Sequence, residues 1–155
     1  MMNTVSFEEF TYPSSDGINT VHACVWIPQD TEPRAIIQLA HGMCEYVARY
    51  DEWARRFAER GIIFCGNDHL GHGQTATAKT DLGYTATRGG ADYIVEDLYT
   101  MTGIINLPAT GSCLFLSLPA HVTPALPFGC VTRSADPSFF CPSEASAPRY
   151  GTSCT

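Results

Sequence analysis

Basic residues are scarce in this chain of 155 residues, which has 9 Lys and Arg against 16 Asp and Glu and a formal net charge of -7. A surface that binds nucleic acid needs Lys and Arg clustered opposite the phosphates. The densest basic group, Arg55, Arg56 and Arg60, is interleaved with acidic residues, as on the solvated face of a helix. The composition therefore predicts no nucleic-acid partner.

A long hydrophobic run is also missing. No stretch approaches the roughly 18 uninterrupted apolar residues of a membrane-spanning helix. Residues 1–10 include Glu8 and Glu9 and have no basic segment followed by an apolar one, so they do not resemble a secretory signal. We expect a soluble, cytoplasmic protein with no transmembrane segment.

The seven cysteines lack the C-x-x-C spacing of a zinc site, and their odd number does not indicate a disulfide framework. Free thiols in a reducing compartment fit this set best. We expect no metal and no cofactor.

Alternating patterns of hydrophobicity predict strands and helices before Asn106. Residues 5–11 and 20–27 are strand-like and flank a turn-rich segment, which predicts an antiparallel hairpin with one face of the second strand better buried. Residues 35–40 and 62–67 are nearly all apolar and predict two central strands. Residues 75–90 are polar and predict a long loop.

Two helices are predicted between and after these strands. Apolar residues at helical spacing from Tyr50 to Ala58, with Gly61 as the C-cap, predict a helix whose aromatic side chains, Tyr50, Trp53 and Phe57, pack in the core. Residues 91–105 predict a second helix. A strand, a helix and a second buried strand imply parallel pairing with a right-handed crossover.

The predicted fold class is α/β, with a partial sheet made of an antiparallel hairpin and a β-α-β unit. We place one domain at residues 1–106 and an irregular, Pro- and Cys-rich tail at residues 107–155, where prolines interrupt every helical pattern. Within the tail only residues 113–118 predict a strand. A shifted reading frame or an alternative splice after about Asn106 is one hypothesis for this change in character.

Two glycine-containing motifs directly follow the two central strands. The first is His41-Gly42-Met43-Cys44-Glu45 and the second is Asp68-His69-Leu70-Gly71-His72-Gly73. Loops at the carboxyl ends of parallel strands line the ligand crevice of an open sheet. Because Gly42 has no Cβ, the backbone there can approach a ligand and the next amide can donate toward an oxyanion.

These motifs and their spacing resemble the monoacylglycerol lipase and lysophospholipase branch of the serine α/β-hydrolases, over roughly residues 7–105. The resemblance implies a small lipid-like ester as substrate and the Met43 N–H as an oxyanion-hole donor. It also implies that His41 and Gly42 bind substrate. The positions that shape the two loops are then Glu45, Asp68, His69, Gly71, His72 and Gly73.

The nucleophile motif Gly-x-Ser-x-Gly of that family is absent from this sequence. Its strand could correspond to Leu114-Phe115-Leu116, but Pro119 then takes the position of the nucleophile. Ser117 and His121 are poor candidates for a dyad. We therefore expect no nucleophile and no triad, and a chain without activity by itself.

Other interpretations stay open at this point. The histidines could be hydrogen-bonded loop residues, and His41, Asp68, His69 and His72 could chemically bind zinc, manganese or iron, although the resemblance explains them without a metal. Cys44 could be a nucleophile in its turn, but no other feature supports this. An alternative function is a non-catalytic binding protein that self-associates through an exposed sheet edge.

Overall fold

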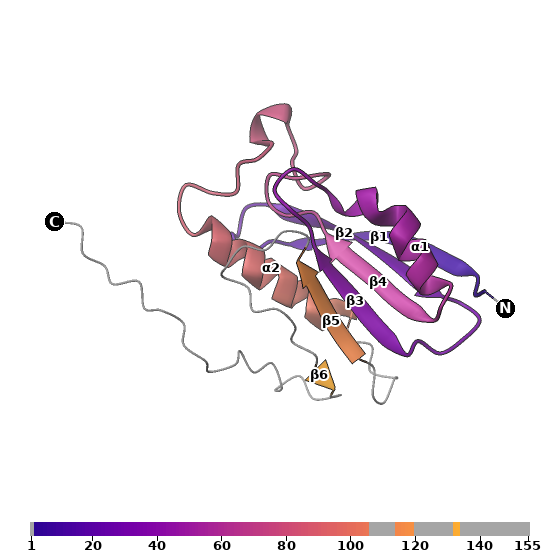
Figure 1. The fold of residues 1–155 in the computed structure, drawn as a ribbon. Coiled ribbons are helices and arrows are strands. Elements are labelled where there is room, and N and C mark those ends of the chain that lie inside the picture. The colour runs from indigo at the N-terminus through magenta and orange to yellow at the C-terminus, as the bar shows by residue number, and fades with distance from the viewer. Residues whose placement is uncertain (1, 106–113, 120–131, 134–155) are drawn as a thin grey trace.

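The computed structural model describes residues 2–105, 114–119 and 132–133, and its ribbon is drawn in Figure 1. The helices are α1 (Asp51–Ala58) and α2 (Gly90–Ile105), with short 3-10 helices η1 (Val47–Tyr50) and η2 (Lys79–Asp81). The strands are β1 (Val5–Pro13), β2 (Thr20–Pro28), β3 (Ala35–Ala40), β4 (Ile62–Asn67), β5 (Leu114–Pro119) and β6 (Thr132–Arg133).

The described strands form one sheet in the order β1-β2-β4-β3-β5-β6. β1 and β2 form the predicted antiparallel hairpin, and β3 runs parallel to both β4 and β5. The α/β class, the hairpin and the β-α-β unit are thus confirmed. The strand predicted at residues 113–118 is confirmed as β5, whereas most of the tail predicted to be irregular lies outside the described residues.

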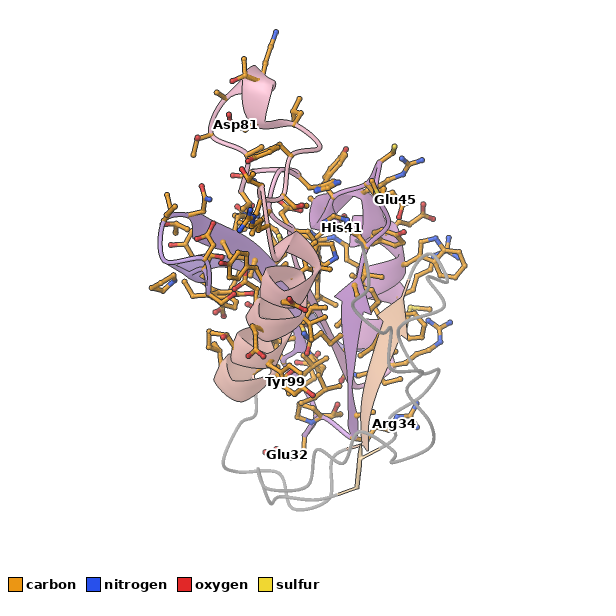
Figure 2. All side chains as sticks on the ribbon, turned by 90° about the vertical axis from the view of Figure 1, so that its left-hand side faces the viewer. Glu32, Arg34, His41, Glu45, Asp81 and Tyr99 are labelled. Carbon is orange, nitrogen blue, oxygen red and sulfur yellow. The ribbon has the colours of Figure 1, made fainter. Side chains whose placement is uncertain are left out.

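Helices cover both faces of the sheet, α1 on one and α2 on the other (Figures 1 and 2). Val21, Ala23 and Val25 of β2 pack in a cluster with Met101 and Ile105 of α2. On the opposite face, the β2 side chains Cys24 and Trp26 pack with Ala54 and Ala58 of α1. The prediction that one face of β2 is better buried than the other is therefore wrong, because a helix from another part of the chain covers each face.

The α1 helix packs on the sheet through two alanines and one aromatic ring. Ala54 and Ala58 are fully buried, and the Phe57 ring stacks on Phe64 of β4 with centroids 5.8 Å apart. The prediction that Trp53 lies in the core is wrong, because its side chain is 64% exposed. Ala54 faces the sheet directly, and one residue along a helix is a rotation of about 100°, which turns Trp53 to the flank.

Buried polar side chains fix α2 against the sheet. Gln38 of β3 donates to the Leu98 carbonyl at 2.9 Å and accepts from the Thr102 hydroxyl at 2.8 Å. Asp97 of α2 accepts hydrogen bonds from the Ser14 hydroxyl and the Ser15 N–H in the turn between β1 and β2. Neither α1 nor α2 is long and apolar enough to cross a membrane, and the same holds for the other helices in the described ranges.

Candidate active site

Both motif loops lie at the same end of the sheet, because β3 and β4 are parallel neighbours whose carboxyl ends are in register at Leu39 and Gly66. Figure 2 shows His41 and Glu45 at this end, with Glu32 and Arg34 at the other. A hollow of about 550 Å³ lies at that other end, lined by Glu32, Arg34 and Arg60 among others. It is therefore remote from the two motifs.

The first loop is a tight turn held by Glu45. The Glu45 N–H donates to the Gly42 carbonyl at 3.1 Å, and the Glu45 carboxylate accepts from the Gly42 N–H at 3.1 Å and from the Tyr50 hydroxyl at 2.6 Å. Burial and the bond to Glu45 raise the pKa of Tyr50 to about 12, so this hydroxyl stays a donor. The turn is thereby fixed from both of its ends.

Met43 occupies the tip of this turn. Its side chain is 76% exposed, and its carbonyl accepts a hydrogen bond from His72 Nε2 at 2.5 Å. Within residues 2–105 its N–H has no hydrogen-bond acceptor. The turn therefore holds a backbone donor at a fixed place while leaving it unused.

Asp68 organises the second loop from a buried position. Its two carboxylate oxygens accept hydrogen bonds from Val47 N at 2.7 Å, Gln74 N at 2.8 Å and His22 Nδ1 at 3.0 Å. Its carbonyl accepts from the Thr75 hydroxyl at 2.8 Å. This one carboxylate joins the second loop to β2 and to the start of η1.

Glycines at positive φ let the second loop close on itself. Gly73 has φ +47°, and a Cβ at this position would overlap the Asp68 carboxylate. Gly71 has φ +73°, and a Cβ there would overlap the carbonyl oxygen of Tyr84. A side chain at either position would therefore displace the segments that pack against these two glycines.

The three histidines of the motifs lie together at this end of the sheet, with ring centroids 4.1 Å apart for His41 and His69 and 5.2 Å apart for His41 and His72. His41 Nε2 accepts from the His69 N–H at 3.0 Å, which leaves Nδ1 to donate to the Gly42 carbonyl. Burial lowers the pKa of His41 and lowers that of His69 to about 3. Both rings are therefore neutral near pH 7.

Sequence reasoning missed His22, the third residue of β2. Its Nδ1 contacts Asp68 and its Nε2 lies 3.2 Å from Glu9 Oε1. The only signal in the sequence was a histidine inside an apolar strand. Cys44, by contrast, is an exposed free thiol in the first turn.

The chain matches the family described as serine aminopeptidase, S33, over residues 31–117, which is more than half of its length. This chain belongs to that family. The matched residues extend through β3, both motif loops, α2 and most of β5.

Individual relatives of this S33 family member include known lipases and esterases. It is 35% identical over 96 residues, 62% of its length, to a monoacylglycerol lipase from Mycolicibacterium smegmatis. Its fold superposes with a TM-score of 0.63 and 29% identity on a thermostable carboxyl esterase from Bacillus coagulans, covering 74% of this chain and 36% of the esterase. It also shares the fold of a monoglyceride lipase from Saccharomyces cerevisiae, with a TM-score of 0.57, 18% identity, and coverage of 77% and 36% of the two chains.

These likenesses identify the described fold as the N-terminal part of a monoacylglycerol-lipase-like α/β-hydrolase. The matched segment makes up 31% of the Mycolicibacterium smegmatis enzyme. The chain thus spans about a third of that relative.

Proposed function

We propose that this chain forms the oxyanion-binding side of a serine hydrolase site for lipid-like esters, such as monoacylglycerols or lysophospholipids. The observation that carries the proposal is the Met43 N–H, which the Glu45-clamped turn holds at the carboxyl end of β3 without an acceptor in the described part of the chain. During ester hydrolysis the carbonyl oxygen becomes an oxyanion, and a fixed backbone donor stabilises it.

Buried polar atoms at the same end of the sheet support this proposal. Asn67 Nδ2, Asn67 Oδ1 and His69 Nδ1 have no hydrogen-bond partner among the described residues. Each buried atom of this kind costs about 1–3 kcal/mol when left unsatisfied. These atoms lie at the carboxyl end of β4 and in the loop that follows it, which supports a site completed by polar groups other than the described residues.

The nucleophile is the part of the chemistry that this sequence does not supply. In hydrolases of this kind the second oxyanion donor is the N–H of the residue that follows the nucleophilic serine. In this chain β5, which we match to the strand before that serine, ends at Pro119, and no Gly-x-Ser-x-Gly occurs in the 155 residues. We infer that the chain alone hydrolyses no ester. Translating the gene in its other two frames tests the frameshift hypothesis, which predicts a Gly-x-Ser-x-Gly shortly after Asn106.

A chimera tests the role of Met43. Residues 1–105 would replace the matching segment of the Mycolicibacterium smegmatis monoacylglycerol lipase, and hydrolysis of a monoacylglycerol would be measured. Met43→Pro removes the N–H at the second position of a turn, where proline fits the backbone. Met43→Ala keeps the N–H and serves as the matched control.

Loss of one oxyanion donor lowers kcat by about 10²–10³-fold. We expect that loss for Met43→Pro and a change of less than about twofold for Met43→Ala. Equal rates for the two variants would refute the assignment. For the chain alone, turnover of a p-nitrophenyl ester that disappears on Ser117→Ala would contradict the inferred lack of activity.

A further inference from the structure

Three different types of metal-binding side chain meet across the β1–β2 hairpin. Glu9 of β1 is the cross-strand partner of Cys24 of β2, and His22 lies two residues from Cys24 on the same face of the strand. The ligand atoms of the three residues all lie within 4.8 Å of one another. Because the pairing of the strands brings position 9 to positions 22 and 24, the cysteine spacing in the sequence gives no hint of this cluster.

We propose that Glu9, His22 and Cys24 bind a divalent transition-metal ion, for which Zn²⁺ is the best match. Zinc binds thiolate, imidazole and carboxylate ligands at about 2.0–2.3 Å, which separates neighbouring ligand atoms in a tetrahedral complex by about 3.4–3.6 Å. His22 Nε2 and Glu9 Oε1 are already 3.2 Å apart. A sulfur ligand disfavours Mg²⁺ and Ca²⁺, which prefer oxygen.

The buried Asp68 carboxylate supplies the support that a metal-binding histidine usually has. Asp68 Oδ2 lies 3.0 Å from His22 Nδ1, and its side chain is 2% exposed. A carboxylate accepts but does not donate, so it holds the proton on Nδ1 and leaves Nε2 as the ligand atom. This arrangement of carboxylate, histidine and metal recurs in protein metal sites.

The cluster also has an entry path. Cys24 and His22 are buried, while the Glu9 side chain is 47% exposed and accepts a 3.2 Å hydrogen bond from the exposed Gln74 side chain. The incoming ion replaces that bond, and the Cys24 thiol releases its proton to solvent as it binds the ion, while His22 Nε2 binds through its lone pair. Three protein ligands leave a fourth position for water.

The expected role of the ion is structural. It would join β1 to β2 directly and, through Asp68, would stiffen the second motif loop at Gln74. This role does not depend on ester hydrolysis, so the metal site and the proposed function succeed or fail separately.

The test uses the full chain with Zn²⁺ alone in calorimetry and thermal unfolding, and with Co²⁺ as a spectroscopic probe. We expect one ion per chain, a higher unfolding temperature with Zn²⁺, and a thiolate-to-cobalt charge-transfer absorption. Glu9→Gln, at an exposed position, and Cys24→Ser should each weaken binding by at least about tenfold. Glu8→Gln on the opposite face of β1 and Cys44→Ser at an exposed thiol are the matched controls.

Four results would overturn the proposal. They are the absence of Zn²⁺ binding, a stoichiometry other than one, equal affinity for the Glu9→Gln and Glu8→Gln variants, and a charge-transfer band that survives Cys24→Ser but is lost in Cys44→Ser. Because Glu9→Gln changes an exposed side chain, the test stays decisive even where Cys24→Ser fails to fold.

Discussion

The two motif loops lie next to each other at one end of the sheet, yet they use their polar groups in opposite ways. The first loop is clamped by Glu45 and leaves the Met43 N–H without an acceptor in the described structure. The second loop is turned inward, and the carboxylate of Asp68 accepts three hydrogen bonds from three different segments. One loop therefore presents a donor, while the other makes the end of the sheet rigid.

This division predicts that substitutions in the second loop affect mainly stability. Asp68 is 1% exposed and its oxygens satisfy donors that have no other acceptor within the described residues. Met43, at the tip of the first loop, packs against little because most of its side chain is exposed. Unfolding of the full chain in urea measures the contrast directly.

Asp68→Ala has the largest expected effect. The substitution removes the acceptor of three donors, which are then buried without a hydrogen bond. They are the N–H groups of Val47 and Gln74 and the Nδ1–H of His22. Breaking a buried charged network in this way costs about 3–5 kcal/mol of unfolding free energy. Asp81→Ala, at an acidic residue whose hydrogen bonds are exposed, is the control and should cost less than about 1 kcal/mol. Equal losses of unfolding free energy in the two variants would show that Asp68 does not hold the second loop together.

Gly73→Ala comes next. The new Cβ collides with Asp68 and the residue must keep φ +47°, so we expect a loss of about 3 kcal/mol from overpacking and left-handed strain together. Gly83→Ala is the matched control, because it has φ +78° but no atom within 4 Å of its Cβ. It should lose only the strain, about 1 kcal/mol. A Gly73 variant no less stable than the Gly83 variant would show that the loop is not tightly closed.

Acid should destabilise the fold through His69. Its pKa is about 3 in the fold and about 6.5 when unfolded, so protonation favours the unfolded chain. This contribution is complete above pH 6.5 and falls by up to about 1.4 kcal/mol per pH unit as the pH drops from 6.5 toward 3. In His69→Gln the slope of unfolding free energy against pH between pH 6.5 and 3 should be smaller, by the amount that corresponds to one proton. Parallel profiles for the variant and the parent chain would contradict the burial of a neutral His69.

Met43→Ala should have the smallest effect on stability. A substitution at an exposed side chain changes the unfolding free energy by less than about 0.5 kcal/mol. Leu70→Ala in the second loop is the reference, because Leu70 is 2% exposed and its truncation should cost about 2–5 kcal/mol. Similar losses of unfolding free energy in the two variants would show that the two loops contribute equally to stability.

Local patterns in the sequence were enough to predict the central strands. The predicted bounds 35–40 and 62–67 agree with β3 and β4, because each apolar run is bounded by residues that favour loops. The prediction that Gly61 is the C-cap of the first helix is wrong by two residues, because α1 ends at Ala58 with Glu59 as its C-cap, although Gly61 has the expected positive φ of +77°. The long loop predicted at 75–90 is interrupted by η2, a single 3-10 turn closed locally by Asp81.

Features that depend on distant contacts could not be predicted in this way. The second buried face of β2 depends on α2, which lies more than sixty residues later in the chain. The motif positions in both loops were recognised from the sequence, but the contacts of Asp68 with His22 and Val47 come from three separate segments. The Glu9, His22 and Cys24 cluster likewise arises only from the register of the hairpin.

Residue-resolved hydrogen exchange of the full chain tests the contrast between the loops most directly. The amides of Val47 and Gln74 donate to Asp68, so we predict that they are strongly protected, while the Met43 amide exchanges at nearly the rate of an unstructured peptide. Protection of Met43 equal to that of Val47 would mean that its N–H already has an acceptor. That result would contradict the proposal that the first loop holds a free donor for an oxyanion.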